Sequence, residues 1–243
     1  MRHGSFFAIA LIGAATAAAA APVKIERTSN LLDFTFAWPA NAAAVPALDH
    51  RFRSELAKAF KQSLTNARED KALAKTQQRP FNQHFYSMQW SSAGETPRLL
   101  SLQSQLSAFE GGAHPNTNYG ALLWDRRSKQ ETSLGALFLR SSSFAALMRT
   151  PYCEALDKER TKRRGGFKID LPEFNVCPKL SELAVAPADR DRDGRFDSID
   201  FVASPYTAGP YAEGEYDIRL PVTRQLIAAV KPAYRASFEA QRQ

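Results

Sequence analysis

The sequence predicts an α+β fold, in which a mostly antiparallel sheet packs with a few amphipathic helices after a cleaved signal peptide. Two observations predict it. Several segments alternate between apolar and polar residues, and neighbouring segments of this kind are expected to pair as strands. The segments with helical periodicity come after groups of strands and do not lie between each strand and the next. The 243 residues are 44% hydrophobic and 23% charged, which is typical of a globular protein with a substantial core.

Residues 1–21 have the parts of a secretory signal peptide. Arg2 and His3 precede a short apolar stretch, which ends in a run of alanines before Pro22. A buried N-terminal helix is the alternative. No cysteine comes directly after the predicted cleavage site, so we expect a periplasmic or secreted protein and not a lipoprotein. Cleavage removes one arginine from a chain of formal charge +7 and leaves +6. The rest of the chain has no apolar run near the roughly 20 residues of a membrane span, so we expect no transmembrane anchor.

The two cysteines are expected to pair. Export delivers a protein to an oxidising compartment, where Cys153 and Cys177 can form a disulfide. Closing a loop of this length stabilises the fold by roughly 3 kcal/mol in the chain-entropy description. A reactive thiol is the alternative, but no supporting motif lies near either cysteine.

The N-terminal part predicts one strand and one long helix. Residues 31–38 predict a strand with one apolar face formed by Leu32, Phe34, Phe36 and Trp38, and Pro39 ends the strand. Over residues 46–75 apolar residues recur every four positions and form one stripe, namely Leu48, Phe52, Leu56, Phe60 and Leu64. The other helix face carries basic residues, which we interpret as a solvated surface: Arg51, Arg53, Lys58, Lys61 and Arg68.

Period-two patterns return after residue 80. The segments 86–90 and 100–108 alternate on either side of a turn signal at 92–95, which predicts an antiparallel hairpin. Residues 119–125 predict a further strand. Serines at 141–143 are suited to cap a helix. Strands are predicted at 199–203 and 216–220, and a last amphipathic helix at 222–238 with a kink at Pro232.

Residues 189–200 carry the strongest chemical motif. Their aspartates and one glycine fit the pattern D-x-D-x-D-G of calcium loops, in which alternate carboxylates of a curled segment converge on one ion. We expect Ca²⁺ bound directly by the carboxylates of Asp189, Asp191 and Asp193, by the carbonyl of Arg195, by Asp197 through a water, and by Asp200, which closes the shell. The alternative is a solvated turn whose acids pair with the interleaved arginines.

The sequence has no recognisable catalytic set. There is no G-x-S-x-G, H-E-x-x-H or phosphate-binding glycine loop. His114 is the best candidate base, although a turn histidine that bonds the backbone is the simpler interpretation. Glu213 and Glu215 are interpreted as solvated acids. We therefore predict no enzyme and no catalytic residue. Export makes nucleic acid an improbable partner for the basic run at 157–168.

Two sequence elements carry a family resemblance. The first is the run Gly111-Gly112-Ala113-His114, and the second is the stretch from Tyr206 to Gly214, which contains Pro210 and Tyr211. Together they resemble the domain of unknown function in the extracellular region of RsiV-type anti-sigma factors, which sense lysozyme. The same domain accompanies the catalytic domain of PdaC-type peptidoglycan deacetylases. The resemblance divides the chain into an N-terminal strand-helix part (22–80) and a C-terminal RsiV-like domain (81–243).

The resemblance implies a binding role at the bacterial cell envelope. Glu110 and Pro115 depart from the family pattern, and the sequence has neither the sigma-binding segment nor the deacetylase domain of those proteins. We therefore expect a non-catalytic module that binds an envelope protein or a cell-wall ligand. A charge of +6 disfavours basic lysozyme as that partner unless the contact surface is acidic. The alternatives are a periplasmic hydrolase of cell-wall glycan or peptide and a purely structural envelope protein.

Overall fold

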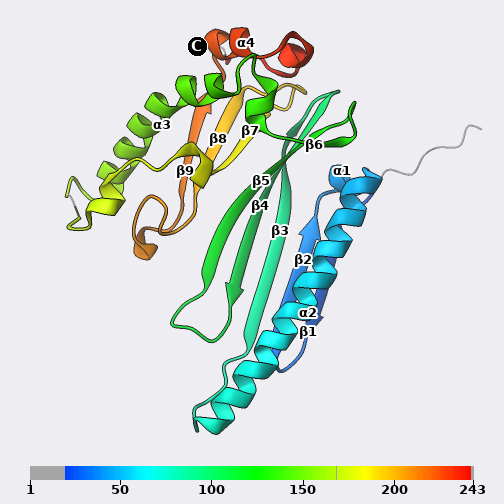
Figure 1. The fold of residues 1–243 in the computed structure, drawn as a ribbon, viewed down its shortest axis with the longest axis vertical. Coiled ribbons are helices and arrows are strands. Elements are labelled where there is room, and N and C mark those ends of the chain that lie inside the picture. Colours follow the sequence, from blue (N-terminus) through cyan, green and yellow to red (C-terminus); the bar gives the residue numbers. More distant parts are fainter. Residues whose placement is uncertain (1–19, 168, 242–243) are drawn as a thin grey trace, which may run out of the picture.

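The computed structural model describes residues 20–167 and 169–241, so the predicted signal peptide lies outside the described residues except for Ala20 and Ala21. Figure 1 shows one large sheet and one small sheet with helices against both. The α+β prediction is confirmed. No helix in the described part of the chain combines the length and the apolar character that crossing a membrane requires.

The large sheet has its six strands in chain order. They are β1 (Val23–Thr28), β2 (Leu32–Trp38), β3 (His84–Glu95), β4 (Leu99–Phe109), β5 (Asn116–Asp125) and β6 (Gln130–Thr132). All neighbours are antiparallel except β2 and β3. A parallel pair needs a long crossover, which here contains α1 (Ala40–Ala43) and the 31-residue α2 (Pro46–Thr76). The predicted boundary after residue 80 therefore falls within one continuous sheet.

The small sheet is antiparallel and is built from β7 (Ala184–Ala188), β8 (Ser198–Ala203) and β9 (Tyr216–Pro221). Helix α3 (Ser141–Arg163) and the short α4 (Arg224–Ala229) pack with it. The remaining turns are 3-10 helices: η1 (Leu134–Leu137), η2 (Pro172–Asn175), η3 (Leu180–Glu182), η4 (Tyr211–Glu213) and η5 (Pro232–Ser237).

Two apolar cores lie on opposite faces of the large sheet. Side chains of successive residues in a strand point to opposite faces, so Leu100 and Leu102 join the core beneath α2, whereas Leu99 joins the core of the small sheet and α3. Strand β7 lies against β3, β4 and β5. The small sheet thus covers only part of the face opposite α2, and the rest of that face stays open.

Three details differ from the sequence expectations. The hairpin turn lies at 96–98 because β3 continues through a bulge at Ser92/Gly94 to Glu95. The last helix is two pieces, since α4 ends at Ala229 and Val230 forms an extended bridge before Pro232 opens η5. Strands β1 and β7 were not predicted, although each pairs with the next strand along the chain; both are short.

Candidate binding site

Two loops that are distant in sequence meet at one end of the sheets. His114, between β4 and β5, stacks on Tyr211, between β8 and β9, with ring centroids 3.8 Å apart. Its Nε2 lies 3.2 Å from the Tyr206 hydroxyl oxygen, and its Nδ1 lies 2.9 Å from the Pro115 carbonyl oxygen. These partners assign a tautomer that donates from Nδ1 and accepts at Nε2. The structure thus brings together the aromatic members of the two family elements.

Tyr206 has a strained backbone at an exposed position. Its φ is 70°, in the left-handed region that residues other than glycine seldom adopt, and the side chain is 52% exposed. Its backbone N–H donates to the Gly209 carbonyl, which closes a tight turn. Strain of this kind persists only where surrounding contacts fix the chain, and it is concentrated at functional sites.

Several glycines of the two elements allow backbone conformations or close contacts that a residue with a side chain would not. At Gly209 an added Cβ would lie 2.2 Å from Glu213 Oε2, so a side chain there would displace that carboxylate. Gly111 has φ of 86°, and an added Cβ would lie 2.8 Å from Asp70 Oδ2 on α2. Gly214 also adopts a positive φ, whereas Gly112 is exposed and open around its Cα. The glycines therefore shape both loops instead of offering ligand-binding side chains.

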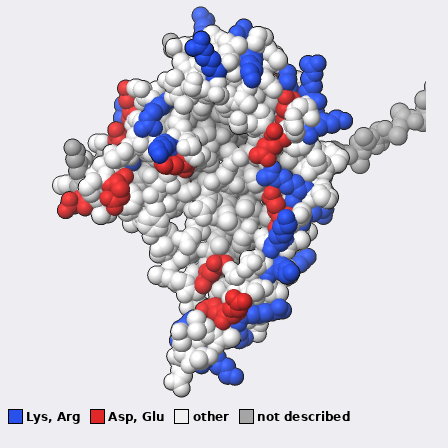
Figure 2. Space-filling model, in the orientation of Figure 1, with Lys and Arg blue, Asp and Glu red and all other residues white. Residues whose placement is uncertain are grey.

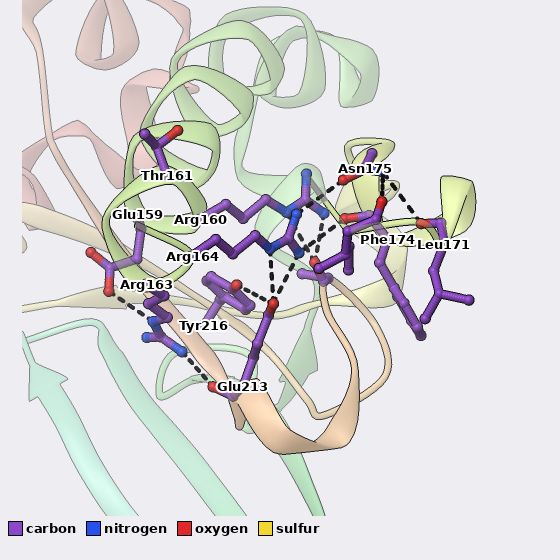
Figure 3. Close-up of polar contacts among 12 residues, drawn as sticks. Glu159, Arg160, Thr161, Arg163, Arg164, Leu171, Phe174, Asn175, Glu213 and Tyr216 are labelled. Atoms are coloured by element: carbon purple, nitrogen blue, oxygen red, sulfur yellow. Dashed lines mark hydrogen bonds and ion pairs between the residues drawn. The ribbon is translucent and has the colours of Figure 1, made fainter. Parts of the chain in front are cut away.

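The β8–β9 loop is held to the end of α3 by a buried ion pair (Figure 3). Arg164 donates from Nε and Nη2 to the two carboxylate oxygens of Glu213, at 2.8 and 2.9 Å. Tyr216 donates its hydroxyl to the same carboxylate. The Arg164 guanidinium lowers the pKa of Glu213, and burial together with the Glu213 carboxylate raises the pKa of Tyr216 to about 12. The predicted solvated acid is therefore a structural anchor.

Two further arginines of α3 bind backbone carbonyls of nearby loops. The buried Arg160 donates to the Ala208 carbonyl and, at 3.0 Å, to that of Val176. Arg163 donates to the Glu213 and Glu215 carbonyls at 2.8 and 2.6 Å. Much of the basic run thus holds the loop that carries Tyr206 and Tyr211. Sequence reasoning missed this role, although the spacing of Arg160 and Arg164 places both on one helix face.

The predicted disulfide between Cys153 and Cys177 is confirmed. It joins α3 to the end of the segment that follows this helix. Arg149 reinforces the junction by donating to the Cys177 and Pro178 carbonyls. The segment that Arg160 and Arg164 contact is therefore held covalently as well as by hydrogen bonds.

A groove of about 280 Å³ lies between the open face of β3–β5 and the small sheet. Its floor includes a cross-strand row formed by Gln89, Gln105 and Tyr119, and one wall bears Glu215 and Asp217. Figure 2 shows a hollowed, mostly white area in the middle of this face, with charged side chains on either side. The groove therefore offers amide, hydroxyl and aromatic groups, with carboxylates along one side.

Two groove residues have unusual polar environments. The side-chain nitrogen of Gln103 is buried and finds no hydrogen-bond partner among the described residues. A buried donor without a partner costs about 1–3 kcal/mol, which a ligand acceptor would offset. Burial and the neighbouring Glu215 carboxylate raise the pKa of Tyr119 to about 12, so this hydroxyl stays protonated.

The aspartate loop between β7 and β8 gathers part of the predicted ligand set. Asp189, Asp191 and Asp197 place carboxylate oxygens within 4.8 Å of one another, and Asp191 and Asp193 do so with Glu239 from the C-terminal segment. Gly194 adopts φ of 90° at the sharp turn. Sequence spacing gave no sign of Glu239, because it lies far along the chain.

Arginines already contact several of these acids. Asp200 is buried, pairs with Arg190 and accepts from Ser198, and it lies in neither acidic group. Arg195 forms ion pairs with Asp193 and Glu239, which lowers the pKa of Asp193. The structure therefore has features of both the calcium loop and the turn of paired charges.

Comparison with known proteins identifies relatives for part of the sequence and for the whole fold. Residues 25–117 match the family described as deacetylase PdaC. A DUF3298 family protein from Pseudomonas aeruginosa PAO1 superposes with a TM-score of 0.56 at 13% identity, over 91% of this chain and 98% of that one. A DUF3298 family member from Bacteroides fragilis gives a TM-score of 0.53 at 15% identity, over 89% and 95%. No curated protein matches the chain.

These findings confirm the family resemblance that the glycine-histidine and proline-tyrosine elements indicate. The sequence match covers β1 to the start of β5, and the structural match extends the likeness through the small sheet. Residues 25–117 are therefore similar to the PdaC family, and the fold of the chain is similar to that of DUF3298 proteins.

Proposed function

We propose that this protein is an exported, non-catalytic binding module of the bacterial envelope, which holds a protein or cell-wall ligand in the groove between its two sheets. The observation that carries the proposal is the groove itself. Amide and aromatic side chains line it, the buried donor of Gln103 lacks a partner, and the strained loop of Tyr206 is held close by. Pockets with a few well-placed polar groups are typical of binding sites.

The groove chemistry favours a ligand rich in hydroxyl and amide groups. Gln89, Gln103 and Gln105 can each donate to and accept from such groups, and the Tyr119 ring offers a flat apolar face. Cell-wall glycan and extended peptide both present these groups. The carboxylates of Glu215 and Asp217 suit a ligand that also carries an amine or a basic side chain.

The surroundings of the candidate base favour binding over catalysis. Both ring nitrogens of His114 have partners, namely the Pro115 carbonyl in its own loop and the Tyr206 hydroxyl in the other, and Glu213 is paired with Arg164. A general base needs a free nitrogen within reach of a substrate proton. The disulfide fits an oxidising compartment, which supports export, and the alanine-rich leader points the same way.

The test is co-sedimentation of the chain from Pro22 onward with purified peptidoglycan sacculi, in which we expect saturable binding. Gln103→Leu with Tyr119→Ala should weaken binding by about tenfold or more, since it removes a buried donor and an aromatic face. The control is Gln62→Leu, at an exposed position outside the groove. Absence of binding to sacculi and to envelope extract alike would contradict the proposal.

The same preparation separates the alternatives. A hydrolase would release soluble fragments from the sacculi, and His114→Ala would abolish that release. A purely structural envelope protein would show neither release nor a saturable ligand. Binding without release, retained in His114→Ala at reduced affinity, is the result we expect.

We also propose that the aspartate loop binds Ca²⁺, with Glu239 as an additional ligand. The convergence of Asp189, Asp191 and Asp197 supports this role, and calcium prefers six to eight oxygen ligands. Calorimetry on chelator-treated protein should show binding in the range of about 10⁻⁴–10⁻³ M, which is typical of extracellular modules. Asp193→Ala should abolish the heat, whereas Glu26→Ala on β1 should not. No heat and no change in melting temperature would end this proposal.

A further inference from the structure

The C-terminal half of α2 carries cations on one side of the helix. Lys61, Arg68, Lys71 and Lys75 fall within one arc of the helical wheel, because their spacings of seven, three and four residues repeat the helical turn. We call these four residues the α2 ridge. All four are exposed. In Figure 2 blue side chains follow the edge of the molecule along which α2 runs in Figure 1.

The α2 ridge differs from the cations in the first half of the same helix. Arg51 pairs with Glu55 and Glu131, and Arg53 pairs with Asp49. Within the described residues no member of the α2 ridge lies in an ion pair, although Glu69 and Asp70 are close in sequence. Asp70 instead pairs with Arg79 and His84. The positive charge of the ridge is therefore not neutralised inside the protein.

Apolar groups lie directly beside these charges. A cavity of about 530 Å³ is lined by Arg68, Lys71 and Lys75 together with Phe81 and smaller apolar side chains. The Lys71 ammonium lies 5.7 Å from the centroid of the Phe81 ring. A surface that only confers solubility needs charges, but it gains nothing from an apolar cavity with a partly buried phenylalanine beside them.

We propose that the α2 ridge docks the protein on an anionic phospholipid surface, with lysine and arginine contacting headgroup phosphates while Phe81 contacts the acyl boundary. Clustered cations next to an apolar cavity have the charge and polarity that such a surface requires. This inference goes beyond the groove and its ligand. Helix α2 covers one sheet face, whereas the groove opens on the other. A docked molecule thus keeps its groove accessible.

The test is co-sedimentation of the chain from Pro22 onward with vesicles of phosphatidylglycerol and phosphatidylcholine, and with phosphatidylcholine alone. We expect binding only to the anionic vesicles, with affinity that falls as salt rises. Lys71→Glu with Lys75→Glu should reduce binding by about tenfold or more. The matched control, Lys158→Glu with Lys162→Glu on the exposed side of α3, changes the net charge equally and should reduce it by at most about threefold.

Further arms separate lipid from other anions. Inorganic phosphate at equal ionic strength should compete no better than chloride. Equal losses in the two lysine pairs, or full competition by phosphate or a soluble polyanion, would each overturn the proposal. None of these residues lines the groove, so sacculus binding should be unchanged in every variant.

Discussion

Helices α2 and α3 are both rich in basic residues, but they use them in opposite ways. The arginines at the end of α3 point into the protein and bind carbonyls and Glu213. The cations at the end of α2 remain on the surface without ion pairs among the described residues. The guanidinium fork can bond several acceptors at once, whereas a lysine ammonium is strongly hydrated and favours the surface. The density of positive charge in a sequence therefore does not indicate which segment faces a partner.

The largest effect should come from breaking the buried pair of α3. Arg164→Met leaves the Glu213 carboxylate buried without its cation, because the Arg164 and Glu213 side chains are only 7% and 14% exposed. We expect a loss of about 3–5 kcal/mol in the free energy of unfolding, measured by urea denaturation. Lys162→Met, on the same helix at an 82% exposed side chain, should change it by less than about 0.5 kcal/mol. Similar losses in both variants would remove the distinction between inward and outward cations.

The next effect concerns the covalent link beside the same arginines. Replacing Cys153 and Cys177 together by serine should lower the free energy of unfolding by roughly 3 kcal/mol. Because Arg160 and Arg164 contact the segment that the disulfide fixes, proteolysis at residues 165–175 should also become faster. Cleavage at the end of α2 should not change. If the disulfide variant were as stable as the parent, the arginine contacts alone would suffice to hold this segment.

A smaller effect tests the charge on Glu213. Its pKa is lowered in the folded protein by Arg164, so its contribution is present above the unfolded value near 4.3 and is lost as pH falls through the folded pKa. Glu213→Gln should therefore cost about 2 kcal/mol at pH 7 and progressively less below about pH 4. Denaturation of both proteins at several pH values measures the difference. A cost that stays constant down to pH 2 would mean that Glu213 acts through shape and not through charge.

The smallest effect is expected at the α2 ridge. Lys71→Gln with Lys75→Gln removes two exposed charges that have no ion pair among the described residues, so stability should change by less than about 0.5 kcal/mol. Thermal denaturation measures this change. A loss above about 1 kcal/mol would show that these lysines, like the arginines of α3, support the fold.

The local pattern of the sequence predicted most of the elements. Alternation over 86–90 and 100–108 places residues on β3 and β4, and the stripe from Leu48 to Leu64 lies on α2. These predictions succeed because strand and helix periodicity follow directly from backbone geometry and burial. The last helix was predicted too long, because the extended Val230 bridges to Phe138, a partner that no local pattern reveals.

By itself, the sequence determined the fold class, the family elements and the pairing of the only two cysteines. The tertiary structure alone decided that His114 stacks on Tyr211, that Glu213 is buried by Arg164, and that Glu239 joins the aspartate loop. Each of these contacts joins residues at least 40 positions apart. Whether these residues come into contact depends on how the two sheets pack. That packing is determined by the burial of many side chains across the protein and not by the contacting residues themselves.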